Sequence, residues 1–344
     1  MPFACMCFTL FALLAAPDGR ATPDFSRFHP ERYQRPFGPR APWNLPTASL
    51  ARHPESARYA RLLWEEGALK PGTGFHLSFD AYTYPVYDAS EATGEYPVEG
   101  MRWSSNLEGK KIPFNPKWLP AGGTDAQVII LDPRSGREWD LWQVRFEGER
   151  VRVSNGNLVP GDYRTREVGF PPSRGCGIPY LAMLVRPEEI MLGEIRHALS
   201  MPIRNTDGRL FVAPATKLEH PEYPGGRIPE GMRFVLDVSD AEIDGWVNTL
   251  PEGLPSVARR SARVIARALR DYGWFVTDTA GAAHLQFECR LTAAEKWEAV
   301  GLAPQTLKGR PYPRALLDGL MRPDRIRAIV PSDQYPPDLR ARPS

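Results

Sequence analysis

Polar and apolar residues alternate along several short stretches of this chain, with the period of two that is typical of half-buried β-strands. Turn-forming residues separate the stretches; the turn DPRSG at 132–136, for example, predicts a hairpin between its neighbours. The predicted strands are residues 74–87, 127–131, 138–146, 149–154, 195–201, 210–212, 232–238 and 326–330. We further expect residues 274–279 and 284–291 to form a hairpin.

The helical period is strongest late in the chain. Pro255-Ser256 starts a helix that Gly273 stops, and its apolar stripe includes Ile265 and Leu269. Its arginines fall mainly on the other side, where they form either a solvated helix face or a ridge that binds a polyanion. Residues 56–66 predict a second, short helix that ends at Gly67.

Many short strands and few helices predict a mainly β protein, an antiparallel β-sandwich or jelly-roll-like fold with one covering helix near 256–272. The 36 prolines and 29 glycines agree with many turns. We expect four parts: a signal peptide (1–21), a Pro/Arg-rich leader lying on the domain (22–50), a single β-rich domain (51–300) and a C-terminal extension with a last strand (301–344).

The N-terminus indicates export. Residues 5–16 form an apolar run of signal-peptide length, although no basic residue precedes it. No later stretch is long and apolar enough for a transmembrane helix. We therefore expect a secreted or periplasmic monomer without a transmembrane segment. The two cysteines outside this apolar run, Cys176 and Cys289, form either one disulfide or two buried thiols.

Charge argues against a nucleic-acid partner, since 43 basic and 41 acidic residues leave a formal charge of only +2. The motifs of metalloproteases, serine hydrolases and phosphate-binding loops are absent. We expect neither a metal nor a cofactor.

The densest group of chemically useful side chains lies at 174–201. Glu189 and His197 lie in an apolar frame there and could act as a general acid–base pair. The alternative is that His197 is a hydrogen-bonded core residue.

Two further groups follow. The segment 214–223, which includes Lys217, is either a ligand-lining loop or a polar crossover. Asp237 and Asp278 each end a predicted strand, and paired carboxylates are what glycoside hydrolysis requires. Asp237 could equally serve a turn.

Four strings, GIPYLAMLVRPEEIMLGEIRHAL, APATK, IPEGMRFVLDVS and ARVIARALRDYGWFVTDTAG, resemble a family of secreted bacterial proteins with no established reaction. The resemblance covers about residues 41–290, and its matched positions include Arg186, Glu189, His197, Arg233 and Asp278. It implies export and an extracellular polymer such as a polysaccharide.

The resulting hypothesis is an extracellular polysaccharide-active enzyme. A lyase would use His197 or Tyr180 as base, with Arg186 and Arg233 neutralising a uronate. A hydrolase would pair Glu189 with Asp278 or Asp237. The substrate-binding set is Tyr180, Arg186, Lys217, Arg233 and Asp237. The alternatives are a non-catalytic protein that binds glycans or the cell surface, and a structural or secretion-associated protein.

Overall fold

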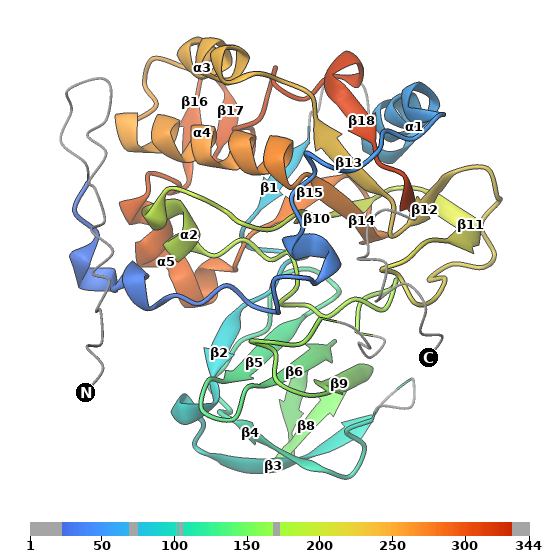
Figure 1. Cartoon of the computed structure of the whole chain (residues 1–344). Coiled ribbons are helices and arrows are strands. Elements are labelled where there is room, and N and C mark those ends of the chain that lie inside the picture. The colour runs from blue at the N-terminus through green and yellow to red at the C-terminus, as the bar shows by residue number, and fades with distance from the viewer. Residues whose placement is uncertain (1–22, 69–74, 101, 103–105, 168–172, 332–344) are drawn as a thin grey trace, which may run out of the picture.

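A computed structural model describes residues 23–68, 75–100, 102, 106–167 and 173–331. The predicted signal peptide lies outside these residues. Strands hold 28% of the chain and helices 23%, which confirms the mainly β prediction. Figure 1 shows two parts, a β-sheet part at the bottom of the view and a mixed part with the helices above it.

Two four-stranded sheets build the lower part. Their strand orders are β2-β5-β6-β9 and β4-β3-β8-β7. One apolar core lies between them, with Ile130 and Leu141 from the first sheet and Val98 and Phe114 from the second. The strands are β2 (Val86–Asp88), β3 (Gly94–Gly100), β4 (Lys111–Phe114), β5 (Val128–Asp132), β6 (Arg137–Trp142), β7 (Arg145–Glu147), β8 (Arg150–Val153) and β9 (Asn155–Val159).

The upper part is organised around the sheet β10-β14-β13-β18, which the main core buries. The strand pairs β1-β15, β11-β12 and β16-β17 complete it. These strands are β1 (His76–Ser78), β10 (Leu199–Ile203), β11 (Thr206–Phe211), β12 (Ile228–Glu230), β13 (Arg233–Leu236), β14 (Trp274–Thr279), β15 (His284–Gln286), β16 (Gln305–Leu307), β17 (Arg310–Tyr312) and β18 (Ile326–Ala328).

The predicted hairpin of β5 and β6 is confirmed, since Ile130 pairs with Trp139 in an antiparallel register. An antiparallel sandwich for the whole chain is not confirmed. β10 pairs with β14 in parallel, and β1 with β15 in parallel. The predicted hairpin at 274–291 is wrong, because β14 and β15 each pair with a strand distant in sequence. Strand alternation identifies a strand but does not select its partner.

Five α-helices, rather than the two predicted, are present in the described residues: α1 (Ser56–Leu62, continued by a π-turn at Leu63–Ala68), α2 (Pro187–Leu192), α3 (Asp240–Thr249), α4 (Ser256–Asp271) and α5 (Arg290–Ala299). α1 is the predicted short helix. α4 is the predicted late helix, and its apolar face enters the main core. The signal for α3 is visible in the sequence: the side chains of Ser239 and Glu242 form a capping box at its start. The alternative interpretation of Asp237 as a turn residue concealed it.

The arginines of α4 bind within the chain rather than forming an open ridge. Arg259 donates to the carbonyl oxygen of Val247, in the last turn of α3, and to that of Leu250, which follows the helix. Arg263 pairs with Asp244 of α3 at 2.6 Å. The arginines on this face of α4 therefore bind α3. Because they already have partners within the chain, a polyanion-binding role is disfavoured.

Both flanking segments pack on the domain. Phe25, Phe37 and Trp43, in the segment predicted as a leader, are buried. Leu302, Leu316 and other residues after 301 belong to the main core. Cys176 and Cys289 are free, buried thiols. None of the described helices has the length and apolar character needed to cross a membrane.

Candidate active-site cleft

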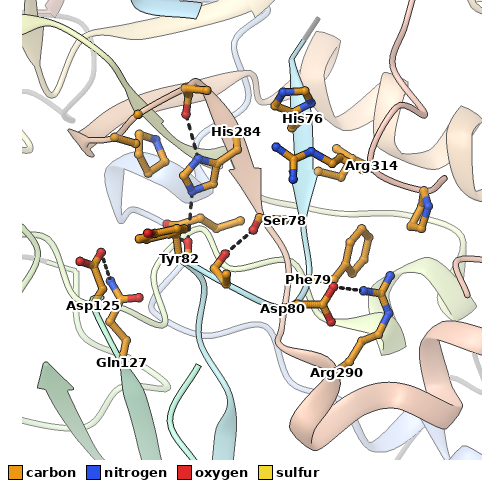
Figure 2. A pocket seen from close by; sticks show the side chains of 18 of the residues that line it. His76, Ser78, Phe79, Asp80, Tyr82, Asp125, Gln127, His284, Arg290 and Arg314 are labelled. Carbon is orange, nitrogen blue, oxygen red and sulfur yellow. Dashed lines mark hydrogen bonds and ion pairs between the residues drawn. The ribbon is translucent and has the colours of Figure 1, made fainter. Parts of the chain in front are cut away.

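A cleft of about 700 Å³ opens where the upper strands β1 and β15 meet the loop that leads into β5. Its wall includes residues 76–82, 124, 125, 127, 278–282, 284, 286 and 311–314. In the view of Figure 2, Asp125 and Gln127 lie toward one side and Arg314 and Arg290 toward the other. Segments that are remote in sequence therefore meet in one concave site, the usual setting of a ligand site.

Asp278, the next-to-last residue of β14, lines this cleft and is partly exposed in it. Burial of its carboxyl group raises the pKa of Asp278 well above its ordinary value, and the neighbouring Glu219 carboxylate raises it further. Glu219 also shares a hydrogen bond with Asp278 and accepts the Thr279 N–H at 2.8 Å. Asp278 therefore favours its protonated form more strongly than an ordinary carboxyl group does.

Glu230, at the end of β12, extends this carboxyl cluster. It is fully buried, and burial raises its pKa to about 7, assisted by the charge of Asp278. One of its oxygens accepts the Glu219 N–H at 3.2 Å, and the other has no hydrogen-bond partner. The three groups share their protons, because carboxylates this close cannot all ionise. On the outer side, His220 Nε2 lies 3.3 Å from a Glu219 oxygen and connects the cluster to the half-exposed surface.

Gly175 provides the space for this cluster. A Cβ atom at residue 175 would lie 2.5 Å from both Asp278 Oδ1 and Glu219 Cδ. Only a residue without a side chain allows the backbone to approach the two carboxyl groups so closely.

A second acidic side chain, Asp125, enters the cleft from the loop before β5. Burial raises its pKa, and its charge in turn raises the pKa of Asp278. Gln127 donates to Asp125 Oδ2 at 3.3 Å (Figure 2). The cleft therefore presents two carboxyl groups from opposite parts of the fold.

Arg174 fixes the floor beneath them. Its buried guanidinium donates to Ser200 Oγ at 2.8 Å, to the Tyr84 hydroxyl at 3.0 Å and to Gln286 Oε1. It also donates to the carbonyl oxygens of residues 179, 180 and 182. Because Gln286 lines the cleft, this network makes the floor rigid.

Tyr82 is the exposed aromatic residue of the cleft, with 41% of its surface accessible. Its φ is +55°, a strained value for a residue with a side chain. Hydrogen bonds hold it there: its N–H donates to the Gly122 carbonyl, and its carbonyl accepts from Gln286 Nε2 at 3.0 Å. The ring lies against Gly123, where a Cβ atom would be only 2.7 Å from it.

The structure places the predicted pair Glu189–His197 away from this cleft. His197 Nε2 lies 3.1 Å from the Glu189 carboxylate, and both side chains are 3% exposed. Arg186 pairs with Glu288 in the same buried region. None of these four residues lines the cleft. Their arrangement is that of a buried network that joins α2 to its surroundings.

Other predicted residues are dispersed. Arg233 is fully buried and donates to the Tyr272 and Leu45 carbonyl oxygens. Asp237 forms an ion pair with Arg327 outside the cleft wall.

Tyr180 and Lys217 lie closer to the site without lining the cleft. Tyr180 is buried and stacks on Tyr84 with ring centroids 4.4 Å apart. The charge of half-exposed Lys217 lowers the pKa of Glu230. Within the 214–223 segment, Glu219 belongs to the carboxyl cluster, but no residue of the segment lines the cleft.

A second buried pair, Glu138 and Asp140 of β6, supports the loop beside the site. Their carboxylates accept the Leu181 and Tyr180 N–H groups at 2.9 and 3.0 Å. Burial raises the pKa of both, that of Asp140 to about 6.

Sequence reasoning identified Asp278 but missed Asp125, Glu219 and Glu230. Only the position of Glu219 inside the 214–223 segment offered a signal, because the others come together through tertiary contacts. Within the described residues, no cluster of His, Cys, Asp and Glu has the arrangement of a metal site.

No protein-family model, no curated protein and no solved structure matches this chain.

Proposed function

We propose that this protein is an extracellular polysaccharide-active enzyme, a glycoside hydrolase that works in the cleft at Asp278. The observation that carries the proposal is a partly exposed carboxyl group with a strongly raised pKa that faces a cleft holding a second carboxyl group. Two carboxyl groups in one cleft are the usual machinery of glycosidic-bond hydrolysis.

In this mechanism protonated Asp278 is the general acid that donates to the departing glycosidic oxygen. Asp125 serves the opposite face of the sugar, as the base for water or as the nucleophile. Glu219 accepts a hydrogen bond from Asp278. His220, which contacts Glu219, connects this pair to solvent, from which Asp278 recovers its proton after the donation. Tyr82 offers an aromatic surface for a sugar ring, which has apolar faces and polar edges.

Export remains part of the proposal. It rests on the apolar run at residues 5–16 and on the resemblance of the four strings to secreted proteins. An extracellular location would bring the cleft to polymers that cannot enter a cell.

The test is to incubate the purified chain with neutral and acidic polysaccharides and to measure new reducing ends and unsaturated-uronate absorbance. We expect reducing ends without that absorbance. General acid catalysis contributes about 10²–10⁴-fold, so Asp278→Asn should lower kcat by at least about 10²-fold. Asp244→Asn, an exposed position on α3, is the matched control.

Two results would overturn the proposal: an Asp278→Asn variant with parental activity, or a chain that cleaves no polymer in the panel. Unsaturated products would assign the cleft to a lyase. Binding without cleavage would support the glycan-binding alternative.

A further inference from the structure

The cleft wall opposite Asp125 carries a cation without an internal partner. Arg314 lines the cleft and is exposed, and no hydrogen bond or ion pair joins its guanidinium to any residue that the structure describes. The two other arginines in this area differ. Arg290 pairs with Asp80 at 2.5 Å, and Arg310 pairs with Asp318.

The backbone fixes Arg314 next to β1. Its carbonyl oxygen accepts the Leu77 N–H at 3.1 Å, which places residue 314 beside His76. Figure 2 shows the Arg314 and His76 side chains next to each other, and neither carries a dashed contact. The His76 imidazole likewise has no hydrogen-bond partner among the described side chains.

The pKa values of the two histidines on this wall also reflect the positive charge of Arg314. Burial lowers the pKa of His76 to about 4, and the positive charge of Arg314 contributes to the shift. Burial also lowers the pKa of His284, again with a contribution from Arg314. Arg314 therefore lies beside two imidazoles whose pKa values are lowered.

We propose that Arg314 and His76 form a subsite for an anionic sugar, with the guanidinium pairing to the oxyanion and the imidazole donating a hydrogen bond to it. A uronate carboxylate is the favoured ligand, because the planar guanidinium fork matches carboxylate geometry. This inference rests on the proposed function and specifies its substrate class: an acidic polysaccharide. It replaces buried Arg186 and Arg233 as the residues that neutralise the substrate's charge.

The test measures binding by calorimetry in the Asp278→Asn background, so that turnover does not interfere. The probes are a galacturonate oligosaccharide, its neutral methyl ester and a sulfated galactan oligosaccharide of equal length. We expect the galacturonate to bind at least about 10-fold more tightly than the ester, since the neutral ester leaves the guanidinium without a charged partner. The added Arg314→Ala change should remove this preference, and Arg314→Lys should restore part of it.

Arg322→Ala is the matched control, because Arg322 is an exposed arginine that pairs with Asp324 outside the cleft wall. Thermal unfolding of each variant checks that the fold persists. Tighter binding of the sulfated probe, lost with Arg314→Ala, would support the anion subsite and assign sulfate esters as its ligand.

Equal affinity for the galacturonate and its ester, or an Arg314→Ala variant with unchanged affinity, would overturn the inference. The two proposals fail separately. Cleavage that depends on Asp278 without an anion preference would leave the hydrolase and remove the subsite. Arg314-dependent binding without cleavage of any polymer would remove the hydrolase and leave the subsite.

Discussion

Replacing Arg174 with Met tests whether the buried guanidinium holds the cleft floor together. The side chain is 1% exposed, and its five N–H groups contact six acceptors, three of them backbone carbonyl oxygens. Met retains much of the volume and none of the donors. Every acceptor therefore loses a partner in a place that water does not reach.

The magnitude follows from two opposing effects. Hydrogen bonds from a charged group contribute about 1.5–3 kcal/mol each, yet keeping the guanidinium out of water costs several kcal/mol. Removing one partner from such a buried network typically costs about 3–5 kcal/mol, and we expect Arg174→Met to lower the free energy of unfolding by that amount. Because the Arg174 charge also lowers the pKa of Asp278, the variant should raise that pKa further.

The assay is urea denaturation followed by tryptophan fluorescence, with Arg322→Met as the exposed control, for which we expect less than about 0.5 kcal/mol. A loss below about 1 kcal/mol in Arg174→Met would refute the reasoning, because the six contacts would then not be needed for the fold.

Three further predictions concern the carboxyl cluster and the buried histidine. Burial raises the Glu230 pKa from 4.5 to about 7, so its contribution to stability is full below pH 4.5 and is lost as the pH rises through 7. Glu230→Gln should flatten this part of the curve of unfolding free energy against pH, and an unchanged slope would contradict the shift. His197→Ala should lower the free energy of unfolding by about 3–5 kcal/mol, because it leaves the buried Glu189 carboxylate without its ion-pair partner. Because this pair lies away from the cleft, kcat should stay near the parental value. A large fall in kcat with an intact fold would instead place His197 in the mechanism. Gly175→Ala should reduce polysaccharide cleavage by displacing Asp278, whereas Gly245→Ala, with open space around it, should not, and equal activities would argue against the close approach.

The local sequence pattern predicted individual elements well. The turn at 132–136 and its alternating flanks gave the β5–β6 hairpin, because hairpin partners are adjacent in the chain. The apolar stripe between Pro255 and Gly273 predicted α4 for a similar reason: helical hydrogen bonds are local. Both features depend on neighbours within a few residues.

What failed was long-range pairing. β14 was assigned to a hairpin with the strand that follows it, yet it lies between β10 and β13. A strand with alternating polar and apolar residues can pair with any strand that offers an apolar face, so only the packed core selects its partner strand.

The candidate site shows the same division. Sequence alone singled out Asp278, because it ends a strand and has a carboxyl group. It also singled out Glu189 and His197, whose proximity within one segment proved to be that of a buried pair. A short sequence separation brings residues together without saying whether a cleft opens beside them.

The sequence by itself determined a β-rich chain with one clear amphipathic helix, because both features follow from the local periodicity of polar and apolar residues. Tertiary structure alone brought Asp125 and Arg314 to the two sides of one cleft, with Asp278 beside Glu219 and Glu230. The physical reason is desolvation: a carboxyl group acquires a raised pKa and a chemical role only after distant segments have enclosed it.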